Sequence, residues 1–241
     1  MPLGHYDVVT GAAGFIGSTL VDRLLERGVS VVGIDSLTPN YDTIEKLQNL
    51  DGARRSSNFI FRQADILDCS LVQFLRGART VYHLAGQPGV QTSWGTGFAS
   101  HLDANVLATQ HLFESSLEAG VERVVLASSS SVYGNTEGMS REEDLLSPVS
   151  PYGVSKLAGE FLAKVYAERG LEVTVLRYFT VYGPRQRPDM AFRRLFTAVN
   201  GGPAFPLRGD GSQRRSFIFV DDVVEATHTV AKQMDWLVLP S

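Results

Sequence analysis

The chain has 241 residues, of which 44% are hydrophobic and 20% are charged, and its formal net charge is −4 at pH 7. This composition is typical of one globular core with a small additional portion, and the mild acidity argues against binding to nucleic acid or an anionic membrane surface. No apolar run approaches the roughly 20 residues that span a bilayer. The single cysteine, Cys69, and an N-terminus without a signal-peptide pattern favour a cytoplasmic protein.

A glycine-rich turn separates the first expected strand from a helix expected over Phe15–Arg27. Its three glycines have the spacing G-x-x-G-x-x-G, which provides a tight bend, close approach of backbone to a pyrophosphate, and close packing of helix on strand. The amides and the positive dipole end of the helix then face the anion. We therefore expect a dinucleotide to contact Gly11, Gly14, Phe15, Ile16 and Gly17.

The second expected strand, Val29–Asp35, ends in a carboxylate about 20 residues beyond the glycines, where a ribose diol is held in dinucleotide-binding folds. Asp35 would repel a 2′-phosphate. The sequence therefore favours NAD over NADP as the cofactor.

Short apolar strands alternate with amphipathic helices along the rest of the chain, as in a parallel sheet covered on both faces. The pattern predicts an α/β fold, a doubly wound Rossmann sheet with a small, incomplete C-terminal substrate-binding portion. We expect NAD binding by residues 1–180, a partial substrate-binding region at 181–216, and a returning helix with a C-terminal stub at 217–241. The expected elements are strands Phe59–Ala64, Thr80–Gly86, Arg123–Ala127 and Glu172–Tyr178, and helices Thr43–Leu50, Asp68–Arg76, Phe98–Ala119, Tyr152–Arg169 and Asp221–Lys232.

The carboxyl ends of the later strands add further candidates. Asp65, followed by Ile66, either reaches an adenine amino group or caps the next helix. The small-residue turn at Leu84 and Ala85 would let backbone lie against the second phosphate and ribose of the cofactor, whereas His83 is expected in the core. The five histidines show no ligand spacing with acids or with Cys69, so no metal site is expected.

Tyr152 and Lys156 lie four residues apart at the start of one expected helix, so their side chains share a face. A phenol normally titrates near pH 10, too high for a base at neutral pH. A neighbouring ammonium, together with the positive nicotinamide of bound NAD, would favour the phenolate and lower that pKa.

The sequence resembles the extended short-chain dehydrogenase/reductase family, and within it the nucleotide-sugar epimerases and dehydratases. Beyond the glycine turn and the Tyr152–Lys156 pair, the resemblance rests on a set of short motifs that covers nearly the whole chain. These are Asp35, Asp65, His83-Leu84-Ala85, Asn105-Val106, Ser128–Gly134, Arg177–Gly183, Arg215 and Phe217–Val224.

The resemblance implies a role for each motif residue. Tyr152 would be the general base that takes a sugar hydroxyl proton as hydride passes to NAD, and Lys156 would bind the nicotinamide ribose and tune the tyrosine. Ser129 would hydrogen-bond the reacting hydroxyl, and Tyr178 would border the cofactor. Asn105 either lies near this proton relay at the substrate or merely holds the local backbone. Ser130 is a candidate substrate contact.

The serine run also separates the reactions of the family. By the resemblance, members that eliminate water from C5 and C6 carry Asp-Glu where this chain has Ser130 and Ser131, and the decarboxylases carry Glu at the second of these places. Without either carboxylate, the remaining reaction is 4-epimerisation: oxidation at C4, rotation of the keto sugar and return of the hydride.

The substrate is expected to be a UDP-sugar. Thr180–Met190 is similar to the segment found in UDP-glucuronate 4-epimerases, and small polar groups with nearby arginines suit a carboxylated sugar. We expect Thr180, Arg185 and Arg187 to face the sugar, although either arginine is equally well explained as a solvated loop charge. Arg215 matches an arginine that pairs with the UDP diphosphate, and Arg208 and Arg214 are weaker candidates.

Relatives in the family continue beyond the length of this chain, so we expect an incomplete substrate pocket, and Trp236–Leu239 would form at most a stub strand. The family dimerises through helices that match Phe98–Ala119 and Tyr152–Arg169, which implies a homodimer. Two alternatives stay open: an NAD-binding relative without independent turnover, acting as a partner subunit or regulatory module, and an oxidoreductase or dehydratase of a deoxysugar pathway.

Overall fold

A computed structural model describes residues 5–136, 138–206, 210 and 215–232. Its centre is a six-stranded parallel sheet with the strand order β3-β2-β1-β4-β5-β6. This order confirms the doubly wound α/β fold. The strands are β1 (Tyr6–Thr10), β2 (Val31–Asp35), β3 (Phe59–Gln63), β4 (Ala78–His83), β5 (Arg123–Ser129) and β6 (Glu172–Tyr178).

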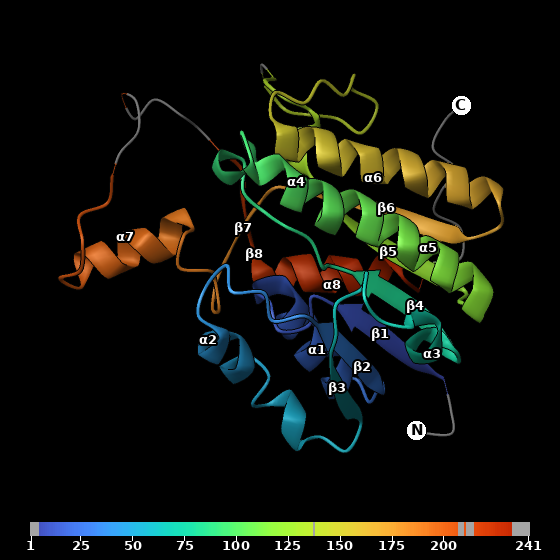
Figure 1. Ribbon diagram of the computed structural model, residues 1–241. Coiled ribbons are helices and arrows are strands. Elements are labelled where there is room, and N and C mark those ends of the chain that lie inside the picture. Colours follow the sequence, from blue (N-terminus) through green and yellow to red (C-terminus); the bar gives the residue numbers. More distant parts are fainter. Residues whose placement is uncertain (1–4, 137, 207–209, 211–214, 233–241) are drawn as a thin grey trace.

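Helices cover both faces of the sheet (Figure 1). Because side chains alternate along a strand, neighbouring residues of β1 serve two separate cores. Val9 packs with the helices on one face, α1 and α8, and Val8 packs with α3, α5 and α6 on the other. The helices are α1 (Phe15–Glu26), α2 (Thr43–Gln48), α3 (Leu71–Leu75), α4 (Gly97–Leu102), α5 (Ala108–Ala119), α6 (Pro151–Glu168), α7 (Ala191–Val199) and α8 (Val220–Val230).

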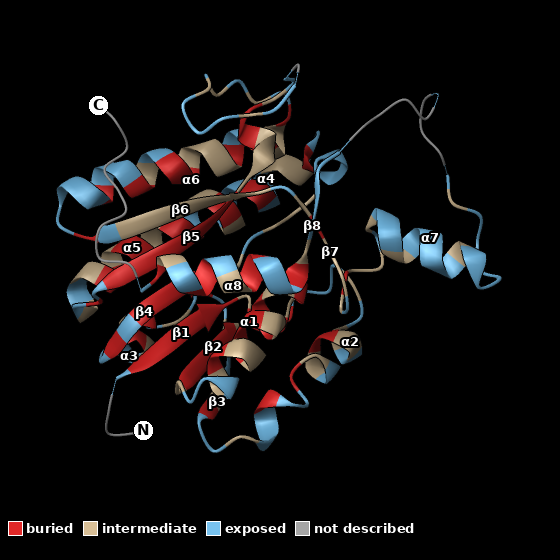
Figure 2. Cartoon of the chain, turned by 180° about the vertical axis from the view of Figure 1, so that it is seen from behind, coloured by how far each residue is buried: buried red, intermediate tan, exposed pale blue. Residues whose placement is uncertain are grey.

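Between the two helical layers, β1, β2, β4 and β5 are largely buried, whereas the edge strands β3 and β6 are only partly buried (Figure 2). Parallel strands covered on both sides are expected to read as continuous apolar runs, as β1 and β5 do. Most element boundaries lie within three residues of those expected from sequence, since helix ends are defined by local capping. Gly28 and Gly120, for example, both take a positive φ just after α1 and α5.

The one long helix expected over Phe98–Ala119 is interrupted. A π-helical turn, Asp103–Leu107, lies between α4 and α5 and carries Asn105. Such π turns are frequent at functional sites because they re-aim one side chain without ending the helix. A π turn contains one more residue than an α-helical turn, and the spacing of hydrophobic residues did not predict it.

Beyond β6, the chain leaves the main sheet as expected. Strand β7 (Thr180–Tyr182) pairs in parallel with β8 (Phe217–Phe219) in a separate two-stranded sheet. Helix α7 stands to one side of the sheet in both ribbon views (Figures 1 and 2). It has no buried residue, and its apolar side chains lie on one face: Phe192, Leu195, Phe196 and Val199. The expected stub strand Trp236–Leu239 lies outside the described residues.

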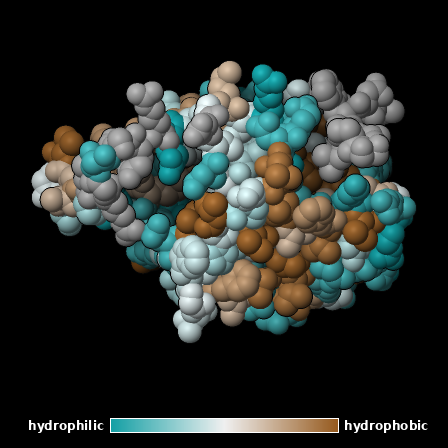
Figure 3. Space-filling model, turned by 90° about the horizontal axis from the view of Figure 1, so that it is seen from above, coloured by the Kyte–Doolittle hydropathy of each residue, from teal (hydrophilic) through white to brown (hydrophobic). Residues whose placement is uncertain are grey.

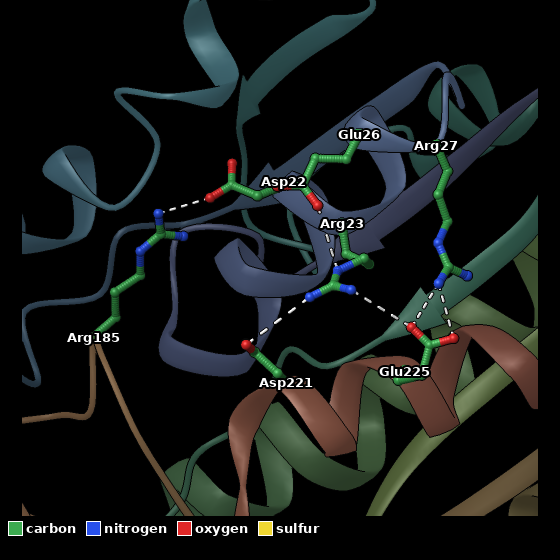
Figure 4. A network of polar contacts seen from close by, with 7 residues as sticks. All are labelled: Asp22, Arg23, Glu26, Arg27, Arg185, Asp221 and Glu225. Atoms are coloured by element: carbon green, nitrogen blue, oxygen red, sulfur yellow. Dashed lines mark hydrogen bonds and ion pairs between the residues drawn. The ribbon is translucent and has the colours of Figure 1, made fainter.

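Ion pairs fasten helix α8 to helix α1 (Figure 4). Arg27 donates to Glu225 at 2.6 and 2.8 Å, and Arg23 lies 3.7 Å from Glu225 and 4.0 Å from Asp221. Each such surface pair contributes little on its own, roughly 0–1 kcal/mol. Together with the apolar contact between the helices, they return the end of the described chain to the main sheet. None of the helices in the described part of the chain is long and apolar enough to span a membrane.

Candidate functional site

The expected site residues gather at the carboxyl edge of the main sheet. The strand order reverses between β1 and β4, and ligands of doubly wound sheets bind outside the strand ends at such a reversal. The ends of β1, β2, β4, β5 and β6 carry, respectively, the glycine turn, Asp35, Leu84 and Ala85, Ser129 and Tyr178. The topology therefore brings residues from five separate chain segments to one edge.

The glycine turn is packed too closely for any larger residue. Gly11 has φ +69°, and a Cβ there would lie 2.8 Å from the Ala85 nitrogen. A Cβ on Gly17 would lie 2.0 Å from the Gly11 carbonyl oxygen. Helix α1 begins directly after Gly14, and no side chain caps its first amides. Uncapped amides at the start of a helix are a ready site for phosphate, so this cradle fits a dinucleotide.

Asp35 fastens the glycine turn to the connection after β2. Its Oδ2 accepts a hydrogen bond from the Ala13 nitrogen at 3.0 Å, and its Oδ1 accepts one from the Leu37 nitrogen at 2.8 Å. Each carboxylate oxygen has a second lone-pair direction, so these bonds leave Asp35 able to accept from ribose hydroxyls. Asn49 on the other side donates to the Ala13 carbonyl at 3.0 Å.

A chain of hydrogen bonds crosses the end of β4. Ala85 donates its N–H to Thr10 Oγ1, which lies 2.8 Å from His83 Nδ1, and His83 Nε2 lies 3.1 Å from Thr109 Oγ1. Thr109 already donates its hydroxyl proton to the Asn105 carbonyl. Nε2 of the histidine must therefore carry the ring proton, and Nδ1 accepts from Thr10.

His83 is thus a neutral core residue, as expected from sequence. Burial, with a smaller effect from the Lys156 charge, lowers the pKa of His83 to about 3. It serves to link β1, β4 and α5.

The Asn105 side chain is hydrogen-bonded to the loop after β4 and to α6. Its Oδ1 accepts from the Gln87 nitrogen at 2.8 Å, and its Nδ2 donates to the Gln87 carbonyl and to Ser155 Oγ, both at 3.0 Å. The side chain is buried and both amide protons are used. The structure therefore favours the second role left open for this residue, that of holding the local backbone, over contact with substrate.

Tyr152 lies half-buried in the first turn of α6, and the Ser129 side chain at the end of β5 is near enough to act on its hydroxyl. Ser150 caps the helix by accepting from the Gly153 nitrogen at 3.1 Å, and Pro151 provides a rigid first residue. Burial raises the pKa of Tyr152, and the Ser129 hydrogen bond and the Arg187 charge oppose that rise without overcoming it. In the chain without cofactor, the expected lowering of this pKa is therefore absent.

Lys156 lies one turn further along α6, where its Nζ donates to the Ala127 carbonyl at 2.9 Å. Burial lowers the pKa of this ammonium to about 8. A Cβ on Gly86 would lie 2.7 Å from Asn105 Oδ1 and 3.3 Å from Lys156 Nζ, so the β4 loop passes directly over the lysine. Only the absence of a side chain at Gly86 permits this approach.

The remaining expected cofactor contacts, Asp65, Ile66 and Tyr178, lie at the same edge of the sheet. The side chains of Asp65 and Tyr178 also make hydrogen bonds within the protein. Asp65 Oδ1 accepts from the Leu67 nitrogen at 2.9 Å in a local turn, and Ile66 is buried. The adenine contact of Asp65 stays a prediction. Tyr178 donates to or accepts from Thr227 of α8 at 2.7 Å, so its hydroxyl fixes that helix and only its ring remains for the cofactor.

The expected substrate residues divide into two groups. The first group lies on the side of Tyr152. Ser130 begins a 3₁₀ turn directly after Ser129, and Thr180 begins β7. Arg187 pairs with Asp189 at 2.9 Å and lies near enough for its charge to act on Tyr152. Arg185 instead points to Asp22 on α1, at 2.7 Å (Figure 4). Arg215 is exposed and engaged with other groups; Arg208 and Arg214 lie outside the described residues.

Arg185 thus departs from the sequence expectation. The structure places its guanidinium on α1 rather than beside Tyr152, and its backbone takes a φ of +68°. The next residue, Gln186, is buried and donates to the Val181 carbonyl at 3.0 Å. We therefore assign Arg185 to anchoring the loop that carries Arg187.

Sequence reasoning missed two buried side chains near Tyr152 and Lys156. His101 meets the Tyr152 ring edge-on, with centroids 6.0 Å apart. Glu160 lies one turn after Lys156 and pairs with Arg177 of β6. Its spacing of four residues from Lys156 could have predicted that the two side chains share one face of the helix. Among the described residues, no three His, Cys, Asp or Glu side chains gather as metal ligands do.

Comparisons with known proteins identify one matching family and several similar relatives. The model of the NAD dependent epimerase/dehydratase family matches residues 8–238. The chain is 43% identical to YtcB of Bacillus subtilis (strain 168), an uncharacterized UDP-glucose epimerase, over 92% of this chain and 71% of the relative. It is 35% identical to a UDP-glucuronate 4-epimerase of Thermodesulfobacterium geofontis (strain OPF15), over 98% of this chain and 74% of the relative.

Among solved structures, the chain is similar to UDP-glucuronic acid 4-epimerase from Bacillus cereus in complex with UDP-glucuronic acid and NAD. The TM-score is 0.92 at 42% identity, and the match covers 95% of this chain and 74% of that chain.

Proposed function

This chain belongs to the NAD dependent epimerase/dehydratase family, and from that premise we propose that it is a 4-epimerase whose substrates are UDP-glucuronate and UDP-galacturonate. NAD is the cofactor of this enzyme family, and UDP-sugars are the substrates of its similar relatives. The observation that carries the reaction class is one constellation. The Ser129 side chain acts on the Tyr152 hydroxyl, Lys156 lies one turn away, and serines occupy the two positions after Ser129.

Each of these residues has a distinct task in the reaction. The Tyr152 oxygen removes the proton from the sugar 4-hydroxyl, while the Ser129 hydroxyl bonds to the reacting oxygen. The Lys156 ammonium stabilises the phenolate form of the tyrosine. When bound, NAD accepts hydride from C4 of the sugar and later returns it. Tyr152 gives its proton back to the 4-oxygen after the keto sugar has rotated, so protons and electrons balance over the cycle.

Elimination and decarboxylation are disfavoured by the residues beside the base. Removing a proton from C5 needs a carboxylate or an equivalent base within hydrogen-bond reach. The 3₁₀ turn after Ser129 presents Ser130 and Ser131, which are too weakly basic for that step. The site therefore has the groups that oxidation at C4 requires, Tyr152, Lys156 and Ser129, and the turn after Ser129 adds no further acid–base pair.

A uronate fits the substrate side of the site. Thr180 and Ser130 supply hydroxyl donors, and Arg187 supplies a charge that already acts on Tyr152. A planar guanidinium binds a carboxylate through two parallel hydrogen bonds. We infer that Arg187 favours the sugar carboxylate and that Arg215 acts at the diphosphate. On this proposal, residues 1–180 bind NAD and also supply Ser130 and Thr180 to the sugar, and residues 181–216 form a partial substrate-binding region.

Incubation with a panel of 4-epimeric UDP-sugar pairs, with products separated by chromatography, tests both the proposed reaction and the proposed substrate. We expect interconversion of UDP-glucuronate and UDP-galacturonate, with slower turnover of UDP-glucose. A chain that carries NAD yet interconverts no pair would overturn the reaction class. Accumulation of a 4-keto product without epimer would favour the dehydratase or oxidoreductase alternative.

Arg187→Gln tests the carboxylate contact. Because a charge-assisted hydrogen bond contributes about 1.5–3 kcal/mol, we expect kcat/KM for UDP-glucuronate to fall by roughly 10- to 100-fold, and that for UDP-glucose by much less. The matched control is Arg193→Gln, which removes a guanidinium that pairs with Glu45 of α2 at 2.9 Å. Equal losses for both sugars in Arg187→Gln would argue against a carboxylate contact.

We also propose that two copies associate through α5 and α6. The face viewed in Figure 3 gathers apolar side chains over these helices, and large exposed apolar patches mark interaction surfaces. The exposed apolar residues on and beside them are Leu102, Leu107, Val154, Phe161 and Val165. Val154, Phe161 and Val165 are spaced seven and four apart, so they share one face of α6.

Phe161→Glu is expected to convert the dimer to a monomer, because a charge at the centre of an apolar interface is left unpaired. Light scattering coupled to size-exclusion chromatography measures the mass directly. The matched control is Phe196→Glu on α7, where the parent side chain is 74% exposed against 63% for Phe161. A dimer that survives Phe161→Glu and dissociates in Phe196→Glu would place the interface on α7 instead.

A further inference from the structure

A buried carboxylate joins α6 to the ends of β5 and β6. Glu160 accepts a hydrogen bond from Ser128, and its oxygens lie 2.9–3.2 Å from Nε and Nη2 of Arg177. The Arg177 and Glu160 side chains are only 15% and 7% exposed. Residues Ser128, Glu160 and Arg177 are called the Glu160 cluster below. A buried ion pair is seldom more stabilising than apolar side chains of the same size, so stability alone is a poor reason for this cluster.

The Glu160 cluster lies directly behind Lys156. Glu160 follows Lys156 by four residues, so the two side chains lie on the same side of α6. Lys156 donates to the carbonyl of Ala127, and the next residue of β5, Ser128, donates to Glu160. Ser128 is paired in the sheet register with Arg177. One carboxylate therefore holds both strand ends against the helix turn that presents the lysine.

Few other charges act on the Lys156 ammonium. The groups that face it are Tyr152 on α6, His83 on β4 and Glu160, with Arg177 on β6 behind the carboxylate. Burial raises the pKa of Tyr152 and lowers that of His83 to about 3, so both are neutral at pH 7. Burial also lowers the pKa of Lys156 to about 8, and the Glu160 charge opposes this fall. Glu160 is thus the negative charge that acts on Lys156 from the next turn of α6, and it is shared with Arg177, which it contacts directly.

We propose that Glu160 is the counter-ion that keeps Lys156 protonated in its buried place, and that it acts on the reaction through that lysine. Because a neighbouring cation favours the phenolate form of Tyr152, loss of the Lys156 charge would weaken the base. Glu160 touches no reacting atom and is therefore a positioning residue. Its catalytic consequence rests on the proposed function, whereas its effect on the charge of Lys156 does not.

The charge of Lys156 is measured directly by NMR. The chain has four lysines, so the side-chain ¹³Cε signal of Lys156 in ¹³C-lysine-labelled protein is assigned by its absence from Lys156→Met. In Glu160→Gln, we expect the titration midpoint of that signal to fall by about one pH unit, the low end of the shift produced by an adjacent opposite charge. The matched control is Glu225→Gln, which removes an exposed carboxylate paired with Arg27, and leaves the midpoint unchanged.

Two further variants separate charge from packing. Glu160→Asp restores the charge and returns the midpoint toward that of the parent. The double variant Glu160→Gln, Arg177→Gln leaves no unpaired buried charge, so it can be used if the single variant does not fold. We expect it to lower the Lys156 titration midpoint in the same direction.

A Lys156 midpoint equal in the parent and in either Gln variant would overturn the proposal, even if those variants were less stable. Where epimerisation is measurable, the alkaline limb of the kcat profile moves with the midpoint. A parent chain without epimerase activity would contradict the proposed function and still leave the NMR result decisive for Glu160.

Discussion

Tyr152→Phe is expected to lower kcat for UDP-sugar epimerisation by about 10³-fold, within the range typical for loss of a general base. The substitution removes one oxygen, the phenol oxygen on which the Ser129 side chain acts. The ring remains beside His101, so the first turn of α6 keeps its packing. Turnover is measured from the rate of product formation with saturating UDP-glucuronate, and cofactor content from the absorbance of NAD released on denaturation.

The matched control for this variant is Tyr166→Phe in the same helix. Its hydroxyl donates to Glu114 at 2.5 Å and accepts from Gln110, away from the strand ends that form the site. We expect a loss of about 1 kcal/mol in the free energy of unfolding and an unchanged kcat. If Tyr152→Phe kept more than a tenth of the parent kcat while Tyr166→Phe was unaffected, another group would have to be the base.

Gly17→Ala is expected to abolish measurable NAD binding. The added methyl would lie 2.0 Å from the Gly11 carbonyl oxygen, a contact that forces the turn away from α1. Overpacking of this kind costs about 1–3 kcal/mol in stability, and the displaced amides lose their alignment with the pyrophosphate. Isothermal titration with NAD reports the affinity, and thermal unfolding reports the stability.

The matched control for the glycine turn is Gly52→Ala. Gly52 has φ −63°, which any residue adopts, and a Cβ there meets only Asp22 Oδ1 at an ordinary 3.6 Å. We expect parental NAD affinity and equal or slightly higher stability in this variant. An NAD affinity of Gly17→Ala within threefold of the parent value would show that close packing of the turn is not needed for the cofactor.

Local sequence patterns sufficed for the elements that hold the cofactor. Gly11, Gly14 and Gly17 need nothing beyond their own spacing, because the steric demand of a tight strand-to-helix turn is met within seven residues. The Tyr152–Lys156 offset likewise fixes their shared face through the helical repeat alone. The glycine turn and the Tyr152–Lys156 spacing both depend on interactions between residues close in sequence, so they can be predicted from sequence alone.

Partners that are distant in sequence were harder to predict. Asn105 was expected either at the substrate or as a backbone contact, and only the fold brings it to Gln87 and Ser155, 18 and 50 residues away. Arg185 was expected either to face the sugar or to be a solvated loop charge, and only the fold shows its pairing with Asp22, 163 residues earlier in the chain. A charged side chain several bonds long reaches whichever opposite charge the tertiary packing places nearest, and sequence spacing does not contain that distance.

The sequence by itself therefore determined the α/β architecture, the glycine turn and the placement of Tyr152 and Lys156 on one helix face, since each depends on backbone geometry within a few residues. The tertiary structure decided which polar groups are already used within the protein. It assigns Asn105 to the loop at Gly86, the Tyr178 hydroxyl to α8, and the Glu160 carboxylate to the strand ends behind Lys156. The physical reason is that hydrogen bonds and buried charges are satisfied by whatever the folded chain brings within about 3 Å, whatever the separation in sequence.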